Sequence, residues 1–81
     1  DPYPNPFNPV TTISYRLPED TIIKLEVYNI DGNLITTIFN GFQVSGNHEV
    51  EWNAINFSSG VYFVKLNAGN YSKTEKLILM K

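Results

Sequence analysis

Apolar and polar residues alternate with a period of two along most of this chain, and no other sequence feature constrains the fold more. Ile13, Tyr15 and Leu17 would share one face of an extended strand, with polar residues between them on the other. The same alternation returns over residues 23–28 and 48–52. Successive side chains of a strand point to opposite faces, so each run predicts a half-buried β-strand.

Turn-forming residues separate these runs. Residues 18–20 and 68–70 are rich in Pro, Gly, Asn and acidic residues, and Asp31-Gly32 is a dipeptide that tolerates the positive φ of a tight hairpin turn. About six or seven strands at intervals of about 10–12 residues are typical of an antiparallel β-sandwich or barrel. No segment shows helical spacing of apolar residues, so the sequence predicts an all-β domain.

Two longer connections are expected. Gly41 and Gly46 bracket a stretch that predicts a loop with an exposed Phe42. Residues 53–60 are mostly polar and predict a second connection, with Ile55 and Phe57 tucked into it.

The final two strands have a different character. Residues 61–66 are apolar on both faces up to Lys65, which predicts a central strand. The last strand, expected over 71–80, ends on the apolar run 77–80 between Lys76 and Lys81. That run is compatible with a strand buried on both faces, or with a sheet edge that offers its backbone to a partner behind gatekeeper lysines. The sequence leaves both readings open.

Residues 1–9 hold four of the five prolines and cannot form a helix or a central strand. They predict a proline-rich linker or lead-in strand, followed by one sandwich domain over residues 10–81. Tyr3 and Phe7 have the spacing to pin this segment onto a sheet edge. Because the chain opens on Asp1, we expect a fragment from the end of a longer protein.

Composition excludes several classes of function. Eighty-one residues suffice for one small domain, and without cysteine there is no disulfide scaffold, thiolate zinc site or cysteine nucleophile. A single histidine excludes a multi-histidine metal centre, so we expect no cofactor. The net charge of −2 argues against a nucleic-acid partner, and no apolar run approaches the roughly 20 residues of a membrane span.

The charges are unevenly distributed along the chain. Residues 65–81 carry four lysines and one glutamate, whereas residues 1–64 carry two basic and seven acidic residues. A basic last strand on an acidic body is usually solvated surface, but it is also a charged handle for a partner.

The candidate catalytic and ligand-binding groups are weak. Glu49 and Glu51 share a strand face, as a pair of glycosidase carboxylates might, but we expect them to be solvent-exposed decoration. His48 fits a residue near the sheet rim, and Asp31-Gly32-Asn33 lacks the further acidic ligands of a calcium loop. We therefore expect no enzyme. Five aromatic residues are candidates for stacking on sugar rings: Tyr28, Phe42, Trp52, Tyr62 and Tyr71. For Trp52 and Tyr62 we favour packing in the core.

Four motifs in this order resemble a known family. They are Tyr-Pro-Asn-Pro-Phe-Asn-Pro at 3–9, Tyr-Asn-Ile-Asp-Gly at 28–32, Ser-Gly-Val-Tyr at 59–62 and Lys-Leu-Ile-Leu-Met-Lys at 76–81. Together they resemble the type A C-terminal sorting domain of the type IX (Por) secretion system of Bacteroidota, over essentially the whole chain. The immunoglobulin-like domain of the flagellar hook-capping protein is similar in pattern.

The resemblance implies an immunoglobulin-like β-sandwich that acts as a non-catalytic address label on a cargo protein preceding it in the same chain. The label would be read in the periplasm by the outer-membrane translocon and its shuttle proteins. A sortase would then remove it at or before the proline-rich opening, leaving the cargo secreted or on the cell surface. The domain would be a monomer. The implied contact residues are Gly60, Tyr62, Lys76, Leu77, Leu79 and Lys81.

The main alternative is a passive module of a secreted glycoside hydrolase. An immunoglobulin-like spacer or a carbohydrate-binding appendage would show the same strand pattern and the same lack of catalytic groups.

Overall fold

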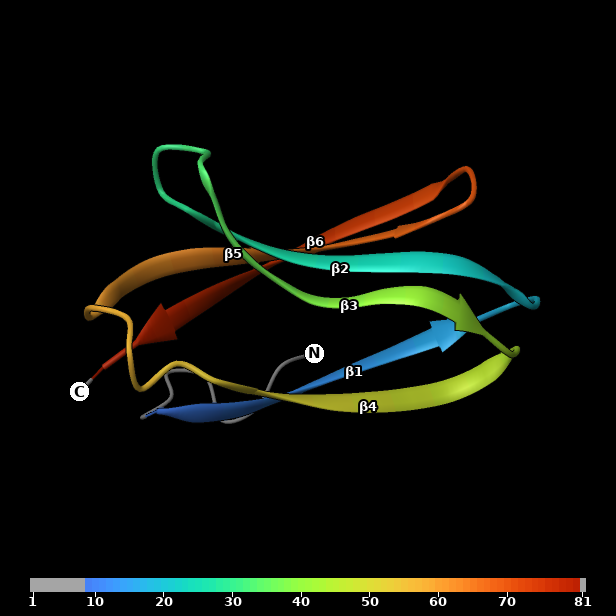
Figure 1. Ribbon diagram of the computed structural model, residues 1–81, viewed down its shortest axis with the longest axis horizontal. Helices are drawn as coiled ribbons and strands as arrows, with labels where there is room; N and C mark the ends of the chain where they lie inside the picture. The colour runs from blue at the N-terminus through green and yellow to red at the C-terminus, as the bar shows by residue number, and fades with distance from the viewer. Residues whose placement is uncertain (1–8, 81) are drawn as a thin grey trace.

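The computed structural model describes residues 9–80 and confirms the all-β fold. Its regular structure in this range consists of six strands and no helix (Figure 1). Within these residues, accordingly, there is no helix of the length and apolarity that a membrane span requires. The strands are β1 (Val10–Leu17), β2 (Thr21–Asn29), β3 (Leu34–Gln43), β4 (Gly46–Asn53), β5 (Gly60–Ala68) and β6 (Tyr71–Leu79).

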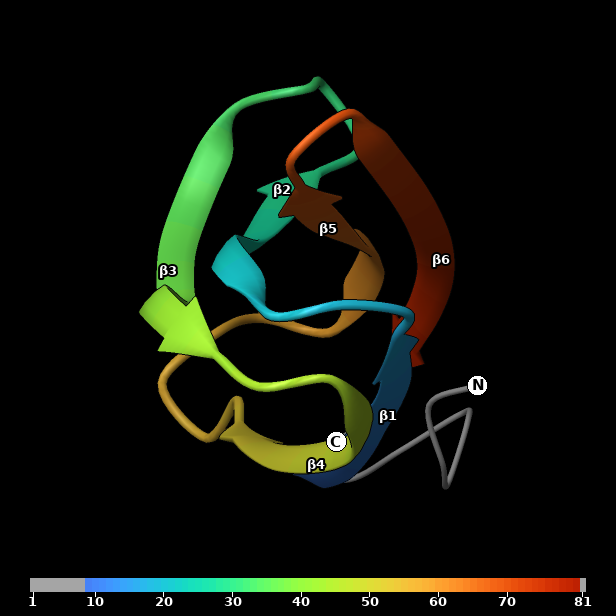
Figure 2. The ribbon, with the colours of Figure 1, turned by 90° about the vertical axis from the view of Figure 1, so that its right-hand side faces the viewer.

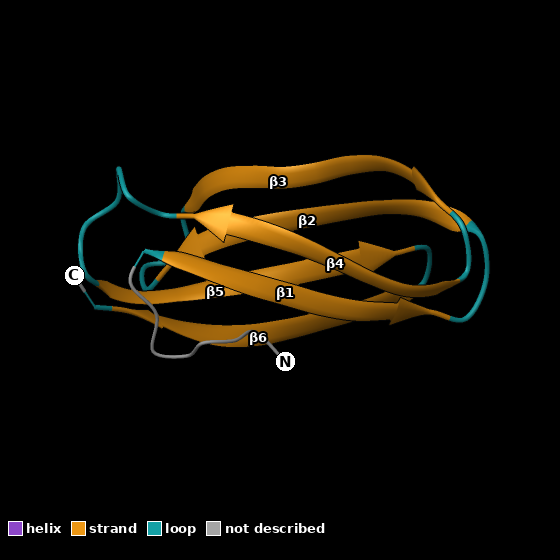
Figure 3. Cartoon of the chain, turned by 90° about the horizontal axis from the view of Figure 1, so that it is seen from below, coloured by secondary structure: helices purple, strands orange, loops and turns teal. Residues whose placement is uncertain are grey.

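The strands form two antiparallel sheets packed face to face. β1 pairs with β4, and the larger sheet has the order β3-β2-β5-β6. Figures 2 and 3 show the smaller sheet lying across one face of the larger, with β1 and β6 on the same side of the molecule. This two-layer sandwich is consistent with the immunoglobulin-like architecture. β5 lies between β2 and β6, which confirms the central strand expected for residues 61–66.

Alternate residues of both sheets build the core. Trp52 of β4 and Tyr62 of β5 join the two layers with their ring centroids 5.7 Å apart in an edge-to-face arrangement. Both side chains are buried, as expected for core aromatics. The other buried apolar residues are Ile13, Leu17, Ile23, Leu25, Val27, Ala54, Val64, Leu66, Ala68, Leu77 and Leu79.

The turn between β2 and β3 forms where Asp31-Gly32 predicts it. Gly32 has a φ of +85°, a conformation that glycine adopts without steric cost. The Asn29 side-chain oxygen accepts hydrogen bonds from the backbone N–H groups of Asp31 and Asn33, each at 2.9 Å. These bonds hold the turn in place.

Two details of the expected connections are wrong. Gly41 and Phe42 belong to β3 and pair with Ile23 and Ile22, so the expected loop shrinks to the two residues before Gly46. The strand continues through Gly41 because its pairing with β2 is maintained. Phe42 is nevertheless exposed, as expected.

The connection after β4 also differs in part. Ile55 is 59% exposed and is not tucked into the core, because its backbone N–H turns back to the Asn53 side chain at 3.1 Å. Phe57 does pack on the core, with its ring centroid 5.6 Å from that of Trp52.

The proline-rich segment lies mostly outside the described residues. Pro9 is described, and its carbonyl oxygen accepts a hydrogen bond from the Ala54 N–H at 2.9 Å. The division into a linker over 1–9 and a domain over 10–81 stays a prediction.

Candidate recognition surface

The β5–β6 pair brings together the residues that the sequence analysis selected from two separate segments. Gly60 pairs with Leu79 and Tyr62 pairs with Leu77, while Lys76 pairs with Phe63. These predicted residues therefore cluster at one end of one strand pair. Lys81, the remaining predicted residue, lies outside the described residues.

The clustered side chains point in two directions. Tyr62, Leu77 and Leu79 are buried in the core, with exposed fractions of 6%, 0% and 1%. Lys76 and Ile78 alternate with them and are exposed on the opposite face. Lys76 and Ile78 are therefore accessible from solvent, while Leu77 and Leu79 hold the strand in place. Direct contact of the two leucines with a partner stays a prediction.

Tyr62 and Gly60 determine the conformation of the chain where it enters β5. The Tyr62 hydroxyl donates a hydrogen bond to the Ser58 carbonyl oxygen at 2.6 Å, which fixes the preceding connection onto the core. Gly60 begins β5 with a φ of +156°, and a Cβ built there meets no atom within 4 Å. Glycine is therefore favoured at this position by backbone conformation and not by space.

Among the described strands β6 pairs with β5 alone, and only its inward face is buried. This excludes the reading of a strand buried on both faces, whereas the offer of its backbone to a partner stays a prediction. An edge of this kind can accept an extended segment of another protein by strand addition. Lys76 lies on this edge as gatekeeper lysines do.

Side chains on the outer face of the larger sheet form rows that cross all four strands. One row consists of Leu34, Tyr28, Phe63 and Lys76 in neighbouring register positions. We call it the apolar row after its first three members. Phe63 and Lys65 were not singled out from the sequence. Alternation in 61–66 shows that they face away from Tyr62, but their neighbours depend on the strand order and register.

A carboxylate lies beside this row. Glu26 of β2 is 9% exposed, and its carboxylate accepts a hydrogen bond from the Tyr28 hydroxyl at 3.0 Å. This hydrogen bond, together with desolvation and the nearby negative charge, raises the pKa of the Tyr28 hydroxyl.

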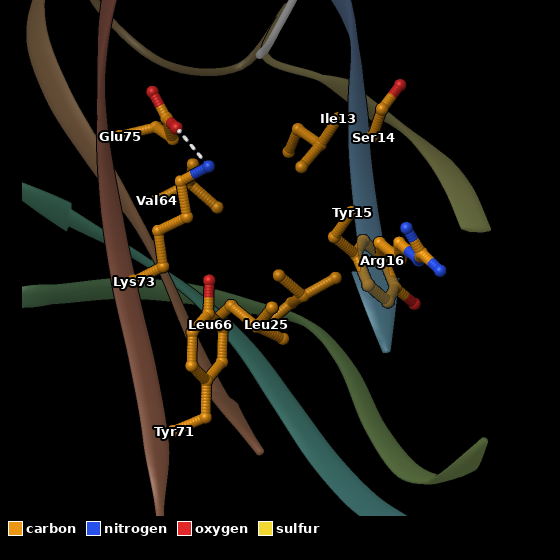
Figure 4. A pocket seen from close by; sticks show the side chains of 10 residues that line it. All are labelled: Ile13, Ser14, Tyr15, Arg16, Leu25, Val64, Leu66, Tyr71, Lys73 and Glu75. Atoms are coloured by element: carbon orange, nitrogen blue, oxygen red, sulfur yellow. Dashed lines mark ion pairs between the residues drawn. The ribbon is translucent and has the colours of Figure 1, made fainter. Parts of the chain in front are cut away.

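A small cleft of about 140 Å³ opens between β1 and β6 (Figure 4). Core residues such as Leu25 and Val64 form its apolar lining, and Lys73 and Glu75 of β6 lie at its rim with their charged atoms 3.1 Å apart. Both charged side chains are partly exposed, so this ion pair contributes at most about 1 kcal/mol. The cleft is smaller than the roughly 300 Å³ typical of small-molecule sites.

The candidate catalytic groups occupy ordinary structural positions. Glu49 and Glu51 are exposed on the outer face of β4. The His48 ring stacks on Tyr15 at 5.3 Å, and its Nε2 lies 2.7 Å from the Val44 carbonyl oxygen. Within residues 9–80, no three acidic or histidine side chains are grouped as a metal site requires.

The aromatic candidates for sugar stacking are divided by the fold. Trp52 and Tyr62 are buried and so cannot stack on a sugar. Phe42 and Tyr71 are exposed, and Tyr28 is half-buried on the outer face of the larger sheet.

Comparison with known proteins adds a family assignment. A family model described as "Secretion system C-terminal sorting domain" matches residues 2–80, nearly the full chain. No curated protein and no solved structure matches the chain.

Proposed function

This chain belongs to the family of secretion system C-terminal sorting domains, and from that premise we propose how it acts as the sorting signal of an exported protein. Membership makes it a signal for type IX secretion, which interacts with the secretion machinery and directs export to the cell surface or the medium. Sorting domains form a signal family without catalysis, so their function depends on being recognised. We propose that the domain is read in the periplasm, as a folded unit, by the outer-membrane translocon and its shuttle proteins.

The exposed edge of β6 is the observation that carries this mechanism. Leu77 and Leu79 anchor the strand in the core, Lys76 and Ile78 face outward, and among the described strands β6 pairs with β5 alone. A partner strand added to this edge would gain main-chain hydrogen bonds, with specificity from the outward side chains. Lys76 would provide a positive charge that favours an acidic partner.

Removal of the label follows export in this proposal. A sortase would cleave at or before the proline-rich segment 1–9, because cleavage within the hydrogen-bonded strands of the sandwich would require the domain to unfold. The cargo would then be released or retained on the cell surface without the domain.

A reporter fusion tests the function. A fluorescent protein with a signal for export to the periplasm is joined to residues 1–81 and expressed in a bacterium that has a type IX system. We expect the fusion to reach the surface or medium and the reporter without the domain to stay in the periplasm. Equal distribution of the two proteins would refute the proposal.

A charge reversal tests the recognised strand. Lys76→Glu with Lys81→Glu is expected to retain the fusion in the periplasm, because it reverses the charge at the proposed contact. Arg16→Glu reverses an exposed charge on β1 of the smaller sheet, away from this strand pair, and serves as the control. If the β6 variant is exported like the parent, the contact does not lie at these lysines.

A further inference from the structure

The outer face of the larger sheet exposes apolar side chains at both of its ends: Ile22 and Phe42 pair at one end, and a larger group lies at the other. Tyr28 and Phe63 lie next to each other across β2 and β5, and Ile30 joins them around a shallow hollow of about 320 Å³. Ile30 is 69% exposed and Leu34, the β3 member of the apolar row, is 52% exposed. Large exposed side chains in one group are typical of a protein-binding surface.

Basic side chains lie along one side of this apolar surface, while the exposed Asp31 follows Ile30 directly in the turn. Lys76 ends the apolar row, and Lys65 and Lys24 occupy the next two rows along the sheet. In the described part of the chain, Glu26 is the one acidic strand residue on this face, and it is largely buried against Tyr28. The outer face of the smaller sheet instead carries Glu49 and Glu51 with one basic residue, Arg16. The two outer faces of the sandwich therefore differ in charge.

We propose that the outer face of the larger sheet, centred on Ile30, Tyr28 and Phe63, docks onto an apolar surface with an acidic rim on a protein of the secretion machinery. This inference rests on the proposed function and extends it from the β6 edge to a surface that spans four strands. The apolar side chains contribute burial, and the three lysines select the acidic rim and accelerate encounter. The face is continuous with β6 through Lys76, so one partner can contact both.

The charge pattern disfavours a second copy of this domain as the occupant. A two-fold contact between copies of this face would bring Lys24, Lys65 and Lys76 of both copies into one interface, where like charges repel. An anionic lipid surface would suit the lysines, but a partner already exists for this domain in the secretion machinery.

Substitutions of opposite charge at one exposed position test the surface. Ile30→Glu and Ile30→Lys both replace a side chain that is 69% exposed, and thermal unfolding of the purified domains checks that the fold is retained. The matched controls are Phe42→Glu and Phe42→Lys, because Phe42 is 63% exposed on β3 at the other end of the sheet. Each variant is placed in the full reporter fusion, and the exported fraction is measured.

We expect Ile30→Glu to reduce export about tenfold, Ile30→Lys to reduce it much less, and both Phe42 variants to export like the parent. If the parent fusion itself is not exported, the proposed function fails. If the parent is exported and both Ile30 variants match it, or the Phe42 variants lose as much, the docking surface is wrong while the function stands. Equal losses for Glu and Lys at position 30 would refute the acidic rim.

Two measurements on the purified domain address the other occupants. Sedimentation that shows a dimer of the parent and a monomer of Ile30→Glu would assign the surface to a second copy. Binding to phosphatidylglycerol vesicles that is lost in Ile30→Glu and kept in Ile30→Lys would assign it to lipid. Either result would overturn the proposal, and we expect a monomer that does not bind these vesicles.

Discussion

Tyr62 on β5 and Leu77 on β6 are directly paired in the antiparallel register, and both side chains are buried. Leu77 has no exposed surface, although it belongs to an edge strand. The pair therefore joins the candidate recognition strand to the centre of the core. The position of Lys76 and Ile78 on the surface depends on it.

Truncation of Leu77 is expected to destabilise the whole domain. Leu77→Ala leaves a cavity at a fully buried site, and such substitutions cost about 2–5 kcal/mol of unfolding free energy. Urea unfolding followed by tryptophan fluorescence measures this, since Trp52 lies in the same core. Ile78→Ala, one residue away and 36% exposed, is the control and should cost less than about 1 kcal/mol. Similar losses for the two variants would mean that β6 is not packed in this orientation.

A substitution at Gly60 is expected to strain the start of β5. Gly60→Ala places a Cβ in open space but forces an L-residue to a φ of +156°, which costs about 1–3 kcal/mol. Gly41→Ala is the matched control, because Gly41 does not have a positive φ and a Cβ there lies 3.5 Å from the Phe39 ring. Unfolding free energies of the two variants should differ in this order. If Gly60→Ala leaves the unfolding free energy unchanged, backbone conformation is not the reason for glycine at the start of β5.

Stability should decline in alkaline solution. Burial raises the pKa of the Tyr15 hydroxyl, and the hydrogen bond to Glu26 raises the pKa of the Tyr28 hydroxyl. The folded domain thus holds both protons more tightly than the unfolded chain, in which tyrosine has a pKa of about 10. The resulting stabilisation is complete below pH about 10 and is lost as the pH rises above it.

Paired variants isolate this effect from the titration of lysines. Unfolding free energies are measured between pH 7 and 11 for the parent and for Tyr15→Phe with Tyr28→Phe. We expect a shallower alkaline decline in the double variant. An identical decline in both proteins would contradict the assigned environments of the two hydroxyl groups.

Export should remove the domain from its cargo. The reporter recovered outside the cell is expected to end at or before residues 1–9, whereas the periplasmic form retains the sandwich. Intact-mass measurement of both forms locates the cleavage site. An exported reporter that carries the complete domain would argue against sortase processing.

Alternation predicted which side chains enter the core with good accuracy. Ile13, Leu17, Ile23, Leu25 and Val27 are buried where the period of two places them, because each strand has one face against the other sheet. The loop boundary that the sequence predicts at Gly41 is wrong, because Gly41 continues β3 and pairs with Ile23. A glycine interrupts a sequence pattern without interrupting a strand.

The order of the strands and the register of their pairing could not be predicted from the sequence. The apolar run 77–80 fits a central or an edge strand equally well, and only the position of β6 beside β5 alone in the described chain decides between them. The row that joins Leu34, Tyr28, Phe63 and Lys76 depends on irregularities in the β2–β3 pairing after Leu25 and after Val27. Such bulges shift which residues are neighbours, so local pattern cannot reveal the surface.

The most direct test of the central claim compares two strains that differ only in the outer-membrane translocon of the type IX system. The fusion of the reporter to residues 1–81 is expressed in both, and its location is measured by cell fractionation. The account predicts a surface or extracellular reporter in the strain with the translocon and a periplasmic reporter in the strain without it. The same location in both strains would contradict the account.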